Sequence, residues 1–374
     1  MNSQRPLTIL QVLPALNGGG VERGVLEIAE AITKAGHRSL VISAGGRMVD
    51  ALTGSGTRHF ECRIGVKSPL TLRHVPWLRR FLVEQRVDVV DVHSRLPAWI
   101  MWFAWKSLLP SRRPALISTV HGLYSPGSYS SIMCRGQHVV AVSESVHRYI
   151  RTHYPFVPKD RLHVIHRGID PAEFPRGFEA SMAWRDKFFR LHPNAAGKPI
   201  LTLPGRLTRL KGHTSFLALM ARLKQLGVIC HGLIVGGVDR KKTAYESELR
   251  ELSRQLELSQ HITFLGDRTD MRELYAISSI VLSLSTKPEA FGRTVAEALS
   301  IGTPVVGYSL GGVDEILQTI FPSGALTHGD IDALVSAVTT LLNRSEVPRP
   351  LPGELSLHTM QRRTVQLYEL ASRR

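Results

Sequence analysis

Two glutamates eight residues apart flank the start of a predicted helix. Glu289 lies in a loop that follows Pro288, Glu297 lies within the helical run 294–300, and Gly292 stands where that helix begins. A helix start offers unpaired backbone N–H groups and a partial positive charge, and glycine lets a polar ligand approach them. Carboxylates at the same place accept hydrogen bonds from hydroxyl groups. The stretch therefore predicts a clamp for a sugar nucleotide, although glutamates at this spacing also occur on the solvent-exposed face of ordinary helices.

Two cations five residues apart follow the predicted strand 200–203. Arg206 stands beside Gly205, and Lys211 stands beside Gly212. A guanidinium offers a planar fork of donors and an ammonium offers a compact charge, so together they can grip a diphosphate. The sequence predicts a diphosphate site here, and the alternative is an ordinary basic surface loop.

His121 is a third candidate, because it directly follows the predicted strand 116–120 and precedes Gly122. Open α/β sheets bind ligands at the carboxyl ends of their strands. The chain has 16 histidines, and an arbitrary one is usually structural or exposed. Position alone leaves both interpretations of His121 open.

A glycine-rich turn lies between the first predicted strand, 7–16, and a predicted helix over 21–34. Its residues Gly19 and Gly20 allow a phosphate or sugar to approach the helix start closely. The alternative is a tight turn with a purely structural role.

The elements that must position these residues alternate between strand and helix along the chain. Short apolar or β-branched runs, each followed by polar or helical sequence, lie at 39–43, 87–92, 116–120, 139–142, 200–203, 232–235, 262–266, 280–285 and 305–308. This alternation predicts an α/β protein with parallel, doubly wound sheets. A length of 374 residues is enough for two domains that each bury a core.

The charge balance is the unusual feature of the composition. The net charge is +16 and the sequence pI is about 10.2. Residues 1–170 hold 22 Lys and Arg against 11 Asp and Glu, a net of +11. Such a field attracts anions, which include nucleotides, nucleic acid and membrane surfaces. A basic nucleic-acid-binding protein is therefore an alternative class, but no helix-turn-helix or zinc-finger pattern supports it.

The cysteines and the N-terminal run indicate a cytoplasmic protein. Cys62, Cys134 and Cys230 form no CxxC pair, so neither a disulfide framework nor a zinc site is expected. The apolar run 7–16 is interrupted by Gln11 and Pro14, and it resembles a first strand more than a signal peptide.

A tryptophan-rich segment at 96–109 contains Trp99, Trp102 and Trp105 and has almost no charge. It is shorter than the roughly 20 residues that a membrane span needs. One interpretation is a buried core helix. The other is a membrane-facing element, because tryptophan favours interfaces and Arg112-Arg113 follow closely. On the second interpretation the first domain docks on an anionic membrane surface, on the inner face of the cytoplasmic membrane.

These motifs resemble those of the retaining glycosyltransferases of family 4, which have the GT-B fold of two Rossmann-like domains facing each other across a cleft. The E-x7-E pattern runs from Glu289 to Glu297, and a G-R-x5-K-G pattern runs from Gly205 to Gly212. The family commonly has a histidine at the strand end corresponding to His121. One departure is His166-Arg167, where the family usually has Pro-Asn.

The resemblance implies an acceptor-binding domain over 1–172 and a nucleotide-sugar-binding domain over 173–354, with a terminal helix in 355–374 crossing back to the first. It implies retaining transfer of a sugar from a nucleoside diphosphate sugar, expected to be UDP-linked, to a hydroxyl group. We expect the acceptor to be a lipopolysaccharide core, another glycolipid or a cell-envelope glycan. We expect neither a metal nor a cofactor, and no nucleic-acid partner. A nucleotide-sugar epimerase of the same fold is the main alternative.

The resemblance also assigns roles to individual residues. It implies that Glu289 contacts the donor sugar, that Glu297 contacts the ribose, and that His121 lies near the reacting sugar. The expected catalytic residues are His121, Arg206, Lys211 and Glu289. The expected donor-binding residues are Gly19, Gly20, Gly205, Arg206, Lys211, Glu289, Ala290, Phe291, Gly292, Arg293, Thr294 and Glu297.

Overall fold

The computed structural model describes residues 5–237, 244–344 and 346–373. The chain forms two compact units. The first comprises the residues up to Gly168 together with those from Leu357 onward, and the second comprises Ile169–Ser356. The divisions thus lie at 168/169 and 356/357, a few residues from the 172/173 and 354/355 of the sequence analysis.

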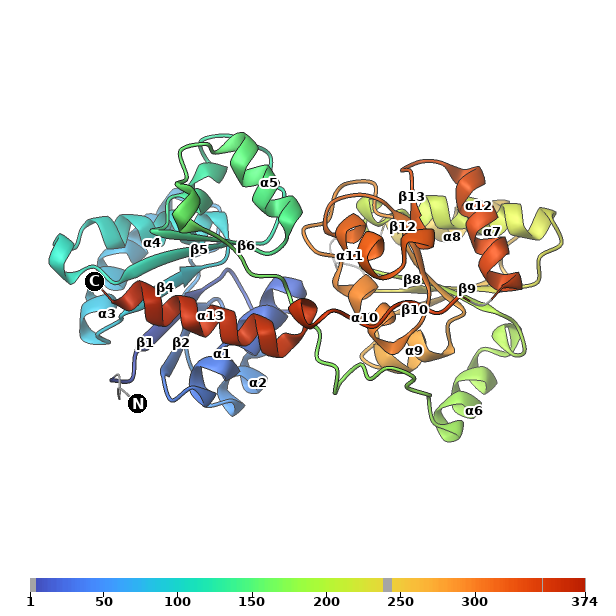
Figure 1. Cartoon of the computed structure of the whole chain (residues 1–374), viewed down its shortest axis with the longest axis horizontal. Helices are drawn as coiled ribbons and strands as arrows, with labels where there is room; N and C mark the ends of the chain where they lie inside the picture. Colours follow the sequence, from blue (N-terminus) through green and yellow to red (C-terminus); the bar gives the residue numbers. More distant parts are fainter. Residues whose placement is uncertain (1–4, 238–243, 345, 374) are drawn as a thin grey trace. The chain divides into compact units, whose positions relative to one another are not determined.

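The first unit is built on a parallel sheet of seven strands in the order β3-β2-β1-β4-β5-β6-β7 within the described part of the chain (Figure 1). This is the Rossmann strand order with one further strand, and the direction of winding changes between β1 and β4. The central strands are buried along their whole length. The strands are β1 (Thr8–Val12), β2 (Arg38–Ser43), β3 (Arg58–Glu61), β4 (Val89–Val92), β5 (Ala115–Val120), β6 (His138–Ala141) and β7 (Leu162–Val164).

Helices cover this first sheet, and the last of them comes from the far end of the sequence. The C-terminal helix α13 (Leu357–Ser372) packs Met360, Leu367 and Tyr368 into the core that also contains Ile9 and Ile28. It lies beside α1 in Figure 1. The other helices of this unit are α1 (Gly20–Lys34), α2 (Val49–Gly54), α3 (His74–Glu84), α4 (Arg95–Lys106) and α5 (Glu144–His153), with short 3-10 turns η1 (Pro69–Arg73), η2 (Pro110–Arg112), η3 (Ser130–Cys134) and η4 (Lys159–Arg161).

The second unit repeats the same plan with six parallel strands, among the residues described, in the order β10-β9-β8-β11-β12-β13. The winding direction changes between β8 and β11, so loops from these two strands leave the sheet at neighbouring positions. The strands are β8 (Ile200–Pro204), β9 (His231–Val235), β10 (Ile262–Gly266), β11 (Ile280–Ser283), β12 (Val305–Tyr308) and β13 (Ala325–Leu326). The helices are α6 (Met182–Leu191), α7 (His213–Gln225), α8 (Ala244–Gln255), α9 (Met271–Ile277), α10 (Arg293–Ile301), α11 (Gly312–Ile320) and α12 (Ile331–Asn343), with 3-10 turns η5 (Pro193–Ala195), η6 (Arg209–Lys211), η7 (Pro322–Gly324) and η8 (Gly353–Leu355).

The predicted α/β class with parallel, doubly wound sheets is confirmed. Some element bounds differ from those predicted, and three short strands were not predicted. The first strand ends at Val12 rather than at residue 16, where Pro14 interrupts the apolar run. Strands β3, β7 and β13 were missed because they are short and β3 reads Arg-His-Phe-Glu, which has no apolar alternation.

The tryptophan-rich segment forms α4, and its tryptophans differ in burial. Trp105 is buried and its indole N–H donates to the Pro114 carbonyl at 2.8 Å. Trp99 and Trp102 are half-buried, and Phe103 is 40% exposed. The helix therefore has one face in the core and another at the surface. Among the described residues, no helix has the length and apolar character needed to cross a bilayer.

Candidate active site

The second unit gathers its predicted site residues where the winding direction changes. Arg206 and Lys211 lie on the loop between β8 and α7, and Glu289 lies on the loop between β11 and α10. Because β8 and β11 are neighbouring parallel strands, both loops emerge at the same edge of the sheet.

Lys211 and Glu289, 78 residues apart in sequence, are in direct contact. Lys211 Nζ donates to Glu289 Oε1 at 2.7 Å, and the side chains are 29% and 24% exposed. Ser285 Oγ donates to the same carboxylate oxygen. A Cβ at Gly205, whose φ is 148°, would lie 3.2 Å from Lys211 Cδ, so glycine leaves room for the lysine side chain. Lys211, which was predicted to bind a diphosphate, and Glu289, which was predicted to bind a sugar, therefore lie in one group of side chains.

Arg206 precedes Lys211 in the same loop and is exposed. In the part of the chain that the structure describes, it has no hydrogen-bond or ion-pair partner. The backbone at this point is close-packed, since a Cβ at Gly236 would lie 2.0 Å from the Gly205 carbonyl oxygen. The loop backbone is thus held in place while the guanidinium extends toward solvent.

Three helices of this unit begin at the site after a glycine. The N-cap residues of α7, α10 and α11 are Gly212, Gly292 and Gly311, with φ of 73°, 94° and 65°, and no side chain caps any of the three. By contrast, Ser143 caps α5 and Asp330 caps α12 through side-chain oxygens. At α11 the Gly312 N–H donates to the Glu289 carbonyl at 2.8 Å, whereas no side chain occupies the first N–H groups of α7 and α10. Helix starts of this kind favour anions.

Glu297 has a different environment from Glu289. It is buried in α10, where Tyr275 Oη donates to its Oε2 at 3.1 Å and Arg293 Nε donates to its Oε1 at 2.9 Å. A carboxylate held in this way is fixed in orientation. The expected contact of Glu297 with a ribose stays a prediction.

The residues between the two glutamates divide into core and surface. Phe291 is 7% exposed and packs with Val295 and Val313. A contact between this residue and the sugar donor would therefore be made by its backbone. Ala290, Arg293 and Thr294 are half-buried around the start of α10.

The first unit places Gly19 and Gly20 at the start of α1, which follows β1. Gly19 is the N-cap residue, with φ 154° and ψ 173°, and no side chain caps the helix. A Cβ at Gly20 would meet nothing within 4 Å. The turn therefore leaves open space beside the backbone of Gly20. The expected contact of Gly19 and Gly20 with a donor stays a prediction.

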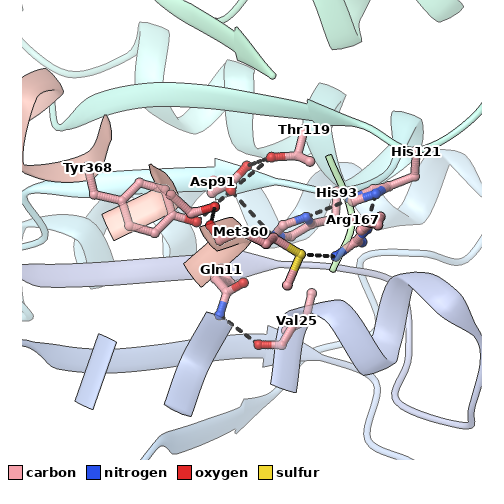
Figure 2. Close-up of polar contacts among 10 residues, drawn as sticks. Gln11, Val25, Asp91, His93, Thr119, His121, Arg167, Met360 and Tyr368 are labelled. Atoms are coloured by element: carbon pink, nitrogen blue, oxygen red, sulfur yellow. Dashed lines mark hydrogen bonds and ion pairs between the residues drawn. The ribbon is translucent and has the colours of Figure 1, made fainter. Parts of the chain in front are cut away.

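His121 lies at the carboxyl end of β5, within a chain of polar contacts shown in Figure 2. Arg167 Nη2 contacts His121 Nδ1 at 2.9 Å, and His93 Nδ1 contacts His121 Nε2 at 2.9 Å. In the sequence, Arg167 stands out only as a departure from the family pattern, and His93 was not predicted as a site residue. The signal that could have found His93 is its place directly after β4, one strand away from His121.

Asp91 lies at the other end of this chain of contacts. Its carboxylate lies 3.7 Å from His93 Nε2 and accepts hydrogen bonds from Thr119 Oγ1 at 2.8 Å and from Tyr368 Oη at 2.7 Å. Tyr368 belongs to α13, so the C-terminal helix is tied to β4 at a buried polar group. These residues line a small cavity of about 20 Å³ with Gly24 and Arg167.

Burial and neighbouring charge keep His121 neutral. Its pKa is lowered well below the ordinary value, first by burial, then by the positive charge of Arg167 and by His93. The pKa of His93 is also lowered, mainly by burial, although Asp91 opposes this. Neither imidazole carries a charge near neutral pH.

The acidic, histidine and cysteine side chains do not gather into a metal site in the described ranges. Among residues 5–237, 244–344 and 346–373, no group of three His, Cys, Asp or Glu side chains could hold a metal ion. The Asp-x-Asp triplet at 330–332 begins α12, where Asp330 Oδ1 accepts a hydrogen bond from the Ala333 N–H at 2.8 Å. The Asp330 carboxylate is therefore a helix cap.

Comparison with known proteins identifies both halves of the chain. A model described as Glycosyltransferase Family 4 matches residues 18–173, and one described as Glycosyl transferases group 1 matches residues 185–351. An uncharacterized glycosyltransferase of Methanocaldococcus jannaschii, MJ1607, is 26% identical over 333 residues, which cover 80% of this chain and 79% of that protein. The N-acetyl-alpha-D-glucosaminyl L-malate synthase of Bacillus anthracis is 24% identical over 274 residues, which cover 71% of this chain and 68% of that enzyme.

Solved structures agree with these matches. The crystal structure of a glycosyltransferase from Rickettsia africae ESF-5 is similar with a TM-score of 0.82 and 28% identity, over 99% of this chain and 100% of that one. Anabaena Alr3699/HepE, crystallised with UDP and glucose, has a TM-score of 0.80 over 97% of this chain and 99% of its own, but at 19% identity it supports the fold alone. The two family models together match most of the chain, and its strand order and site motifs agree with them. The chain therefore belongs to the family 4 glycosyltransferases with the GT-B fold.

Proposed function

We propose that this glycosyltransferase moves a sugar from a nucleoside diphosphate sugar to a hydroxyl group, with retention of the anomeric configuration and without a metal ion. The contact between Lys211 and Glu289 beside the uncapped starts of α7 and α10 carries the proposal, because it combines cation, carboxylate and backbone donors in one place. The carboxylate suits the hydroxyl groups of a sugar, and the cation and N–H groups suit a diphosphate.

The hard step in such a reaction is the negative charge that develops on the departing diphosphate. Lys211, Arg206 and the backbone N–H groups at the helix starts are preorganised donors for that charge. In the proposed mechanism they supply the electrostatic stabilisation that other enzymes take from a bound cation.

Retention constrains the roles of the carboxylates. Double displacement needs a carboxylate nucleophile close to the anomeric carbon. Glu289 already accepts hydrogen bonds from Lys211 and Ser285, which suits it to binding a sugar rather than attacking it. We therefore assign attack to the acceptor hydroxyl from the same face as the leaving group, with the departing phosphate taking the acceptor proton. His121 is proposed to lie near the reacting sugar.

The donor is proposed to be UDP-linked. Support comes from the similarity of fold to Alr3699/HepE, whose crystal structures contain UDP, UDP-glucose or UDP with glucose. A panel of nucleotide sugars, scored by nucleoside diphosphate release and by thermal shift, tests this assignment. Release from a UDP-sugar supports it. Conversion of the donor to an isomer without release indicates an epimerase instead.

The acceptor is proposed to be a glycolipid, such as a lipopolysaccharide core, that the first unit reaches by docking on an anionic membrane. A surface cavity of about 600 Å³ combines Trp102, Trp105 and Phe156 with the cations Lys106 and Arg135. Lys106 lies 5.5 Å from the Trp102 ring centre, and Phe156 is 55% exposed. Within the described residues, no carboxylate pairs with Lys106 or Arg135.

This surface suits an anionic, partly apolar layer. Basic residues near an anionic membrane contribute roughly 1 kcal/mol each, and exposed aromatic rings add apolar burial. The crystal structure of WaaG, a glycosyltransferase of lipopolysaccharide biosynthesis, has the same fold with a TM-score of 0.68 and 14% identity, which supports the architecture alone.

Vesicle sedimentation tests the docking proposal. The protein should pellet with anionic vesicles at low salt, remain free with neutral vesicles, and dissociate as salt rises. Phe156→Ser and Lys106→Glu should weaken binding, whereas Ile229→Ser, which changes an apolar residue of the second unit that is 72% exposed, should not. Equal indifference to both vesicle types contradicts docking and leaves the transferase proposal intact.

A further inference from the structure

The contacts of His121 fix the position of its proton. Arginine carries only hydrogen-bond donors, so the 2.9 Å contact from Arg167 Nη2 requires a lone pair on His121 Nδ1. The single proton of the neutral ring then lies on Nε2. Because Nε2 is 2.9 Å from His93 Nδ1, His121 donates to His93.

The contact with His121 also fixes the proton of His93. Its Nδ1 accepts from His121, so its own proton lies on Nε2, which is buried and faces Asp91 Oδ2 at 3.7 Å. Asp91 accepts from Thr119 and Tyr368 as well. The N–H donors of Arg167, His121 and His93 therefore all point toward Asp91, so the contacts run from the cation at one end to the carboxylate at the other (Figure 2). The two hydrogen bonds that lead from Arg167 through His121 to His93 are aligned in one direction and strengthen each other. His93 Nε2 has no hydrogen-bond partner among the described residues, so its attraction to Asp91 over 3.7 Å is electrostatic.

The opposite arrangement of protons is strongly disfavoured. It would direct the N–H of His121 Nδ1 against the guanidinium of Arg167, and it would direct the lone pair of His93 Nε2 against the carboxylate of Asp91. The other groups that face this cluster are Tyr124, which is hydrogen-bonded to the backbone at His121, and Tyr368 behind Asp91. Neither tyrosine is charged near neutral pH, because burial raises the pKa of both phenols.

The guanidinium of Arg167 packs against Gly24 of α1. A Cβ at Gly24 would lie 1.6 Å from Arg167 Nη1, so glycine at this point of α1 leaves room for the guanidinium in its observed position. Glycine in a helix interior destabilises the helix relative to alanine, so its use here calls for a structural reason. Arg167 Nη1 also lies 4.0 Å from Met360 Sδ on α13. Arg167 therefore contacts both α1 and α13.

We infer that Arg167 is a positioning residue that holds His121, and through it His93, as the uncharged Nε2–H tautomer. Its relevance to transfer rests on the proposed function, in which His121 lies near the reacting sugar. In this state both nitrogens of His121 are engaged, so the imidazole acts by a fixed position and not by taking up or releasing a proton.

Nitrogen NMR of the protein labelled with ¹⁵N-histidine tests the inference directly, because the ¹⁵N shifts report which ring nitrogen carries the proton. The His121→Asn and His93→Asn variants assign the two sets of signals. We expect Nε2–H tautomers for both rings, unchanged between about pH 5.5 and 8.5. In Arg167→Met, which removes the donor and the charge at similar size, His121 should lose the pure Nε2–H signal and begin to titrate in this range. Arg167→Lys should retain most of the wild-type pattern.

Kinetics with the sugar donor that the nucleotide-sugar panel identifies provide the second readout. Arg167→Met should lower kcat at least tenfold at pH 6 and less at pH 8, with KM for the donor changed less than threefold, and Arg167→Lys should recover part of the loss. Arg222→Met, the same substitution at an exposed arginine of α7, serves as the matched control. Circular dichroism confirms that each variant is folded.

The outcomes separate the inference from the proposed function. An Nδ1–H tautomer at either ring, or titration of His121 in the wild type within this range, overturns the inference whatever the activity. If the tautomers are as expected but wild type and Arg167→Met have identical pH profiles, the positioning role is overturned. Absence of transfer by the wild type with every nucleotide sugar counts against the proposed function, while the NMR result still decides whether Arg167 sets the tautomers.

Discussion

Replacement of Lys211 by methionine separates catalysis from stability most clearly. The side chains of Lys211 and Glu289 are about a quarter exposed, and ion pairs at such sites contribute roughly 0–1 kcal/mol to folding. Loss of one preorganised donor to a developing anion, by contrast, typically lowers turnover about 10²- to 10³-fold, or roughly 3–4 kcal/mol in the activation barrier. Lys211→Met should therefore impair transfer far more than it impairs folding.

The assay compares kcat, KM and thermal midpoint for wild type and variant. A matched control is Lys224→Met, which removes another lysine–glutamate ion pair of the same unit, Lys224 Nζ to Glu257 Oε2 at 3.0 Å, away from the site. Both variants should shift the midpoint by a few degrees at most, and only Lys211→Met should lose turnover. Turnover of a folded Lys211→Met variant within threefold of wild type would refute the proposed role of Lys211 at the diphosphate.

Further predictions concern the donor site, the metal and pH. Arg206→Ala should lower turnover about 10²- to 10³-fold with no loss of stability, since this exposed guanidinium lacks a protein partner in the described chain; an unchanged kcat argues against its role at the diphosphate. Activity should persist in excess EDTA, and a strict requirement for added Mg²⁺ or Mn²⁺ contradicts the metal-independent proposal. The pKa values of buried His213 and His231 are lowered to about 4, mainly by burial. Since the unfolded chain binds protons that the folded chain does not between about pH 6.5 and 4, stability should fall through this window as the pH decreases, by an order of 1–2 kcal/mol per histidine at pH 5. Urea unfolding at pH 7 and pH 5 measures this loss, and His231→Gln should reduce it; a pH-independent midpoint contradicts it.

Much of the fold follows from local pattern. Runs such as 116–120 and 305–308 are apolar and β-branched, and each became a buried strand. The glycines before α1 and α10 correctly marked helix starts. Short polar strands such as β3 carry no such pattern, because the neighbouring strand and not the sequence places them in the sheet.

The site was predictable as a set of residues but not as a set of contacts. The contact between Lys211 and Glu289 depends on the adjacency of β8 and β11, which lies in the strand order rather than in either motif. Burial of Glu297 depends on the packing of α10, whose residues 295–301 are all buried. The partners of His121 come from the residue after β4 and from the segment after β7, and Tyr368 behind them comes from the last helix. Spacing in sequence contains no information on these encounters.

The most direct test of the proposed reaction is the donor reaction itself, followed by proton NMR with purified protein in the presence of EDTA. Without an acceptor, water takes the place of the hydroxyl group, so slow hydrolysis of the correct donor should release UDP. The sugar should first appear in the same anomeric configuration as in the donor, and Lys211→Met should suppress this release. Release of the opposite anomer would contradict retention, and failure to bind or cleave any nucleotide sugar would contradict the proposed function.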